Sequence, residues 1–178
     1  MTEQVSPPEG FKPRNFTQVI SLIVGAVLFV LGACGLLYPG FAGLHLGVVH
    51  CLIICVAGAT LFYNGGWKDN GFYAFICCFF FGAFFGFLGL VGFIFGSPGT
   101  PSIGFTEPDP NLFVLIKGIA EYGRLDHILN ASIGIILMGG AFDWQRRGGL
   151  TTYRTQRKKR IVKENEEKRK ERLRYAHR

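Results

Sequence analysis

The chain has 178 residues, of which 49% are hydrophobic, and it contains 25 glycines and 18 phenylalanines. Long apolar runs with this much glycine are typical of helices packed in lipid, and they exclude an ordinary soluble domain. The net charge of +7 is unevenly spread. Residues 145–178 carry 14 basic and four acidic side chains, whereas residues 1–144 carry five basic and eight acidic ones. The basic character therefore belongs to the tail.

Four apolar runs follow one another along the chain, separated by segments rich in glycine, proline, asparagine and aspartate. The runs are Phe16–Leu37, Leu44–Tyr63, Phe72–Phe95 and Leu125–Phe142. Each is close to the roughly 20 residues that a helix needs to cross a hydrocarbon core of about 30 Å. We therefore predict an all-α integral membrane protein, a bundle of four transmembrane helices.

The predicted organisation has three parts: an N-terminal segment (1–15), a four-span membrane domain (16–143) and a basic C-terminal tail (144–178). An even number of spans places both termini on one side of the membrane. That side holds 17 of the 19 lysine and arginine residues. Because basic loops stay in the cytoplasm, we expect cytoplasmic termini in a bacterial inner or thylakoid-type membrane.

The third apolar run carries glycines at intervals of three and four residues. They are Gly82, Gly86, Gly89, Gly92 and Gly96. Small residues at this spacing let two helix backbones approach closely. We expect a tight helix contact here, within the molecule or with a neighbour. The phenylalanines between the glycines pack against lipid and core, or alternatively form a surface for flat cofactors.

The segment between the third and fourth runs is predicted to contain a short helix over Asn111–Glu121. Asp109 is a suitable N-cap, and Pro110 is favourable at the first helical position. The helix would have one apolar face and lie along the outer membrane interface.

Polar residues inside apolar runs are the best indicators of function in a membrane protein. His50 lies six residues into its run and Asn130 five residues into the fourth. At 1.5 Å per residue both are about 8 to 9 Å deep, so they could meet across a helix contact. His45, Asp126 and His127 would form a shallower polar layer.

Three interpretations of this layer stay open. In the first, His50, Asp126 and Asn130 form an interhelical polar clamp whose hydrogen bonds contribute roughly 0.5 to 2 kcal/mol each. In the second, His50 or His127 is an axial ligand of haem or chlorophyll. In the third, the layer belongs to a proton or ion path, although no acidic residue lies near the bilayer midplane.

No catalytic motif is present, and we predict that the protein is not an enzyme. There is no glycine-rich phosphate loop, metalloprotease helix or nucleophile elbow. The five cysteines all lie in apolar runs, where cysteine usually acts as a small hydrophobe. Cys51 and Cys55 share a helix face, but we predict no metal site.

The tail is predicted to be a charged, solvent-exposed helix without a core of its own. Its basic clusters are Arg157, Lys158, Lys159 and Arg160, followed by Lys168, Arg169 and Lys170. A polybasic segment next to a span commonly binds anionic lipid headgroups. We expect a partner protein or anionic lipid on this tail, and no nucleic acid.

The order of the spans and the residues that punctuate them resemble a bacterial and cyanobacterial family of small four-span membrane proteins that is known only as a domain of unknown function. The resemblance covers residues 16–142. It rests on the run from Leu22-Ile23-Val24-Gly25 to Leu36, on His50 followed by Gly58, and on Leu125–Gly134. In that family the last segment has Asn where this chain has His127, and His where it has Asn130. The resemblance implies the four-span fold and no established activity.

These observations predict a non-enzymatic accessory or scaffolding subunit that docks on a larger membrane protein complex through glycine-rich helix faces and the basic tail. One alternative is a haem- or chlorophyll-binding subunit of a photosynthetic or respiratory complex. Chlorophyll, carotenoid and haem are its candidate cofactors, although the sequence requires none. The other alternative is a small transporter or channel.

Overall fold

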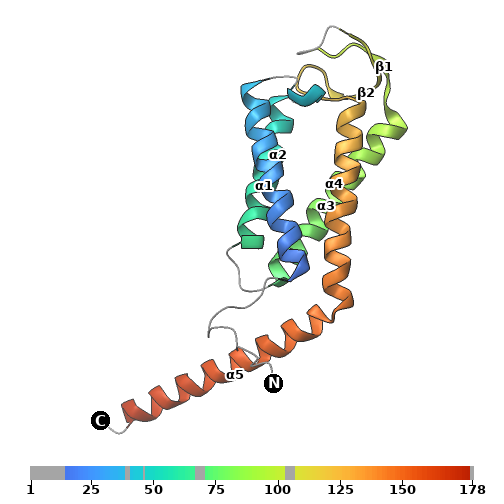
Figure 1. Cartoon of the computed structure of the whole chain (residues 1–178). Helices are drawn as coiled ribbons and strands as arrows, with labels where there is room; N and C mark the ends of the chain where they lie inside the picture. The colour runs from blue at the N-terminus through green and yellow to red at the C-terminus, as the bar shows by residue number, and fades with distance from the viewer. Residues whose placement is uncertain (1–14, 39–40, 46, 67–70, 103–106, 177–178) are drawn as a thin grey trace, which may run out of the picture.

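A computed structural model gives the structure of residues 15–38, 41–45, 47–66, 71–102 and 107–176 (Figure 1). In the last helix the side chains of residues 150–152, 156, 170, 171 and 173–176 also lie outside this description. The predicted N-terminal segment, apart from Asn15, lies outside the described residues. The side chain of Lys170, one of the predicted basic residues of the tail, also lies outside the described residues.

The described residues form five long helices, a short 3-10 turn and a small sheet. Their order is α1 (Phe16–Leu37), η1 (Phe41–Gly43), α2 (Val48–Gly66), α3 (Gly71–Phe95), β1 (Ser97–Gly99), β2 (Asp109–Ile116), β3 (Ala120–Tyr122), α4 (Arg124–Arg146) and α5 (Gly149–Ala176). Helices α1 to α4 are long and apolar enough to cross a membrane. The predicted four-helix membrane bundle with a helical tail is confirmed.

The boundaries of the first two spans have clear local causes. Asn15 caps α1, because its side chain accepts the Gln18 amide hydrogen while the Gln18 side chain accepts the Asn15 amide hydrogen. Helix α2 begins at Val48 rather than at Leu44 as predicted. Ala42 has a φ of 57° and Gly43 a φ of 75°. These left-handed residues form the η1 turn, and helix α2 forms only beyond it.

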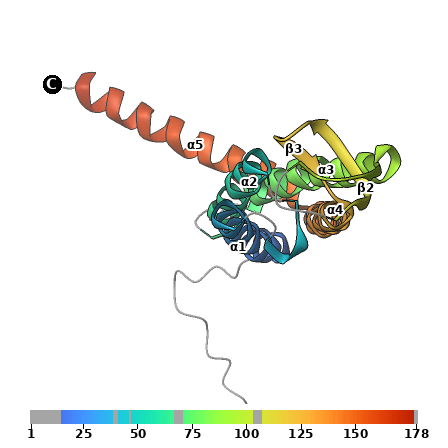
Figure 2. The ribbon, with the colours of Figure 1, turned by 90° about the horizontal axis from the view of Figure 1, so that it is seen from above.

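The spanning helices pack mainly in two pairs, α1 with α2 and α3 with α4 (Figures 1 and 2). Glycines bring the backbones of the first pair together. A Cβ atom added at Gly25 would lie 2.8 Å from the carbonyl oxygen of Gly58, and one added at Gly58 would lie equally close to that of Gly25. Only glycine fits such a contact, which gives the dispersion energy that helices in lipid depend on.

Glycines of α3 make the corresponding contact with α4. A Cβ atom at Gly89 would lie 2.6 Å from the amide nitrogen of Ala131, and one at Gly82 would lie 2.9 Å from that of Met138. Gly86 faces Gly134 across the same contact. The glycine-rich face of α3 is therefore covered by α4 of the same chain.

Large apolar side chains point away from the bundle. Phe87 is 69% exposed and Ile135 is 74% exposed, whereas the buried positions of α3 are mostly glycine, alanine and cysteine. A buried helix face built mostly from small residues, with aromatic and branched side chains outside, is the reverse of a helix in a soluble core. It suits helices whose outer surface faces lipid.

The segment between α3 and α4 lies at the end of the bundle that the predicted orientation makes the outer end. It is a three-stranded antiparallel sheet in the order β1-β2-β3, and the prediction of a helix over Asn111–Glu121 is wrong. Gly118, with a φ of 73°, lies in the turn between β2 and β3, a conformation that interrupts a helix. Asp109 does not cap a helix. It accepts the amide hydrogen of Asn111, two residues on, and so forms a local turn.

An aromatic stack fixes the start of α5 to the inner end of the bundle. Trp144 stacks on Phe75 with ring centroids 4.6 Å apart, and Tyr153 stacks on Phe72 at 4.1 Å. Helix α4 runs past the predicted domain boundary at residue 143, and the chain turns at Gly148, whose φ is 71°. Helix α5 then leaves the bundle at a steep angle to the spans in both views (Figures 1 and 2).

The glycine contact between α3 and α4 can be tested with a matched pair of substitutions. Gly89→Ala places a methyl group against the α4 backbone, and we expect it to destabilise the protein by about 1 to 3 kcal/mol. Gly139→Ala is the control, because a Cβ atom there would meet nothing within 4 Å. The midpoint of thermal unfolding in detergent should fall for G89A alone. Equal midpoints would contradict this packing.

Candidate functional site: a polar layer at the outer end

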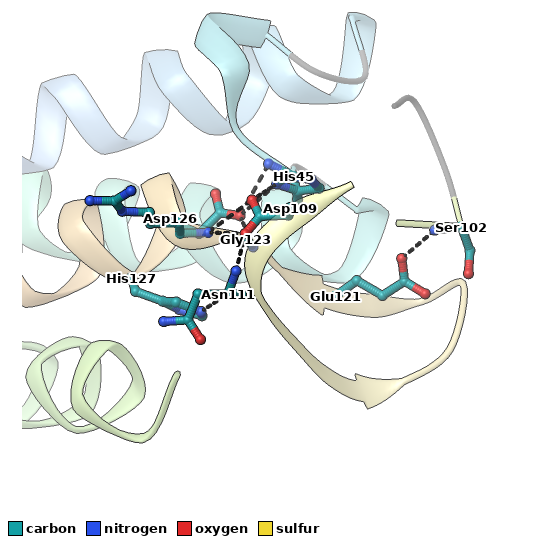
Figure 3. Close-up of polar contacts among 9 residues, drawn as sticks. His45, Ser102, Asp109, Asn111, Glu121, Gly123, Asp126 and His127 are labelled. Carbon is teal, nitrogen blue, oxygen red and sulfur yellow. Dashed lines mark hydrogen bonds and ion pairs between the residues drawn. The ribbon is translucent and has the colours of Figure 1, made fainter. Parts of the chain in front are cut away.

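Polar side chains from both helix pairs and from the sheet gather at the outer end of the bundle (Figure 3). This outer polar layer consists of His45, His50, Asp109, Asn111, Asp126, His127 and Asn130. Apart from Asp109 and Asn111, all of these side chains are less than 9% exposed. Polar groups buried to this extent at membrane depth need partners.

Asp126 is the centre of the layer. One carboxylate oxygen accepts the amide hydrogen of Gly123 at 2.7 Å and that of His45 at 3.1 Å. The first bond caps α4, since Asp126 occupies its third position and carries negative charge in the first turn. The second ties α4 to the segment that enters α2. Asp126 therefore joins the two helix pairs, and it is completely buried.

His45 lies between two carboxylates. Its Nδ1 atom is 3.5 Å from Asp126 Oδ2 and 4.0 Å from Asp109 Oδ2. Asp109 also accepts the amide hydrogen of Arg124, so that β2 is held to the start of α4. The His45 ring fills the space where a side chain on Gly123 would otherwise lie. Depth along the apolar runs had placed His45 and Asp126 in one layer. The sequence had suggested Asp109 only as a helix N-cap, so its place in this group was missed.

His127 links α3, α4 and the sheet. Its Nε2 atom lies 3.0 Å from the carbonyl oxygen of Asn111, and because a carbonyl only accepts, Nε2 carries the proton. The ring occupies the space beside Gly92, as the Asn111 side chain does beside Gly96. The last two glycines of the predicted set thus make room for polar side chains of the layer.

His50 and Asn130 are fully enclosed, at 1% and 0% exposure. Among the residues that the structure describes, no hydrogen bond joins these two side chains. The predicted clamp therefore does not run through a His50–Asn130 hydrogen bond. Instead the His50 ring packs on Tyr122, with centroids 4.7 Å apart, and the link between the helix pairs is made by Asp126 and the His45 backbone.

The two histidines do not fit the role of axial ligands. A haem or chlorophyll needs an imidazole nitrogen that faces a flat space. The His50 ring is enclosed against Tyr122. The Nε2 atom of His127 is hydrogen-bonded to the Asn111 carbonyl oxygen, and the other side of the ring lies against Gly92. Neither ring has an open face, and both are at most 1% exposed. Within the described residues, no group of three histidine, cysteine or acidic side chains could hold a metal ion.

The interior below the layer is apolar. The core there is built from residues of all four spans, including Leu28, Ile54, Phe85 and Leu137, each at most 1% exposed. Thr17 and Ser21 are buried at the inner end, where their hydroxyl groups donate to the carbonyl oxygens of Gly140 and Leu61. An apolar zone therefore separates the polar groups at the two ends, which disfavours an ion path through the bundle.

Glu121 organises the sheet above the layer. Its carboxylate accepts the amide hydrogen of Ser102 at 2.6 Å and that of Gly118 at 2.8 Å. Burial alone would raise the pKa of Glu121, but the hydrogen bonds from Gly118 and Ser102 outweigh it and lower that pKa. From the sequence, Glu121 was predicted only as the last residue of a short helix.

Asp126 should contribute more to stability than an acidic residue at the other end of the same helix. Asp126→Ala removes the acceptor of two backbone amides, and we expect a loss of about 2 to 4 kcal/mol. Asp143→Ala is the control, because its partner Arg147 is 69% exposed and such pairs contribute about 1 kcal/mol or less. Unfolding midpoints in detergent compare the two. A loss of similar size in both variants would contradict the role assigned to Asp126.

The Glu121 hydrogen bonds should depend on pH. Because the folded pKa is lowered, their stabilisation is complete above the ordinary carboxyl pKa and is lost as pH falls through the folded pKa. We expect the amide proton shifts of Gly118 and Ser102 to follow this titration in nuclear magnetic resonance spectra. Glu121→Gln should abolish the titration. Shifts that titrate unchanged in E121Q would show that another group is responsible.

No protein-family model, curated protein or solved structure matches this chain. The resemblance to the four-span family therefore stays a prediction. What the geometry itself provides is a four-helix membrane unit with a closed polar layer at one end and a long charged helix at the other.

Proposed function

We propose that this protein is a non-enzymatic accessory subunit of a larger membrane protein complex, and that α5 is the arm through which it docks. The observation that carries the proposal is α5 itself. It has 28 residues, and beyond its first turns all its described side chains are exposed. A helix of this length that, beyond its first turns, packs on none of the described residues of its own chain is suited to contact another molecule.

The internal packing of the bundle supports the same proposal. The polar layer is closed by Asp126, His45 and the sheet, and the glycine faces of α3 and α1 are used within the chain. These features support the proposed role as a scaffold. Docking through the glycine-rich face of α3 is not part of the proposal, because α4 covers that face.

The charge of α5 favours a polar partner surface. Lys168 and Glu164 form an exposed pair at 2.7 Å, which supports the helix without a core. Acidic and basic residues are interspersed beyond Lys163, as in helices that bridge between domains. Other membrane subunits are the proposed protein partners, in a bacterial inner or thylakoid-type membrane with the termini in the cytoplasm. Anionic lipid is the second proposed partner.

The proposal is tested by affinity purification of the tagged full-length chain from its native membrane in mild detergent, followed by mass spectrometry. We expect stoichiometric recovery with one assembly. The variant K168Q/R169Q/K170Q should lose that assembly, because it removes partner-facing charge from α5. The control K117Q/R124Q, which removes basic charge at the opposite end, should retain it.

Recovery of the wild-type chain alone would contradict the accessory role and turn attention to ion-flux assays in liposomes. Recovery of the assembly with both variants would leave α5 without a docking role.

A further inference from the structure

The net positive charge of α5 is concentrated in the half that lies next to the bundle. The proximal half, residues 149–163, has six basic and no acidic residues. The distal half, residues 164–176, has five basic and four acidic residues. At 1.5 Å per residue the proximal half is about 22 Å long. A charged helix that only extends into solvent would not need this separation of net charge between its two halves.

The cations of the proximal half have no acidic partner among the residues that the structure describes. Their described side chains, such as those of Arg157, Lys158 and Arg160, are exposed. Among the described side chains, none of the proximal cations forms an ion pair, whereas Lys168 of the distal half pairs with Glu164. The proximal half therefore presents uncompensated positive charge.

The start of α5 sets its direction. Gly148 turns the chain at the end of α4, and the stack of Tyr153 on Phe72 holds the first turns against α3. Both views show α5 leaving across the direction of the spans rather than continuing it (Figures 1 and 2). Figure 1 also shows α5 slanting away from the bundle toward its C-terminal end, so its proximal half lies nearer than its distal half to where headgroups would surround the ends of the spans.

We propose that the proximal half of α5 binds the anionic headgroups of the bilayer leaflet next to it, and that the distal half is left free for protein partners. Lipid binding by the proximal half deepens the proposed function, which includes anionic lipid as a partner, and is argued from the position and charge of the helix. The role of the distal half rests on the proposed docking function. Juxtamembrane basic segments are attracted to anionic lipid in this way, within about one Debye length of the surface.

The binding is electrostatic and does not insert the helix. Ile161 and Val162 are adjacent, so they point to different sides of α5 and form no apolar stripe. An inserted interfacial helix needs a broad apolar face. Salt should therefore weaken the contact, as it does for exposed charges.

The experiment measures hydrogen exchange of α5 in full-length protein reconstituted alone into nanodiscs. One preparation contains phosphatidylcholine only, and the other contains phosphatidylcholine with phosphatidylglycerol. We expect amides of the proximal half to exchange at least about fivefold more slowly in the anionic discs, the factor that one basic residue near such a surface contributes. Amides of the distal half should exchange equally in both, and high salt should remove the difference.

Two matched variants each remove four charges. R157Q/K158Q/K159Q/R160Q should abolish the lipid-dependent protection, and K168Q/R169Q/K170Q/R172Q should keep it. Glutamine has nearly the helix propensity of lysine and arginine, so both helices should persist, which circular dichroism checks. Equal exchange of the wild-type protein in both lipids, or equal loss in both variants, would overturn the proposal. Because the discs contain no partner protein, this outcome is independent of whether a complex is found.

Discussion

Helices in lipid gain little from burying apolar surface against one another, since lipid tails are as apolar as leucine. Their association depends on close contact between backbones, and the rest of this structure follows from that constraint. Glycine allows the contact between α1 and α2 at Gly25 and Gly58, and between α3 and α4 at Gly82 and Gly89. The large side chains are left on the outside, where they face lipid.

Two helix pairs formed in this way still have to be held together, and polar groups at their ends contribute to that. At the outer end, Asp126 accepts amide hydrogens from α4 itself and from the segment that enters α2. At the inner end, the Thr17 hydroxyl of α1 donates to the Gly140 carbonyl of α4. Hydrogen bonds are specific in direction, so they fix the register of pairs that dispersion alone would let slide.

Glycine has a second use in this chain, which is to make room for a side chain. His127 lies against Gly92, His45 against Gly123, and Trp144 against Gly149. The last contact belongs to the aromatic stack that sets the direction of α5. The same property, the absence of a Cβ atom, thus shapes the helix pairs, the outer polar layer and the exit of the charged arm.

The sequence by itself determined the number and approximate ends of the spans and the helical tail, because length, hydropathy and charge are local properties. The glycine spacing of α3 also correctly predicted a close helix contact. That the partner is α4 could be learned only from the tertiary structure. The outer segment was predicted as a helix from Asp109 and Pro110. The turn at Gly118 is local, but the pairing of β1 with β2 and the bond from Ser102 to Glu121 join residues far apart in the sequence, so only the structure gave the sheet. Likewise, depth along the helices suggested that His50 and Asn130 meet. Depth does not specify how each helix is rotated and packed. In the structure the His50 ring packs on Tyr122, and Asp126 and the His45 backbone link the helix pairs.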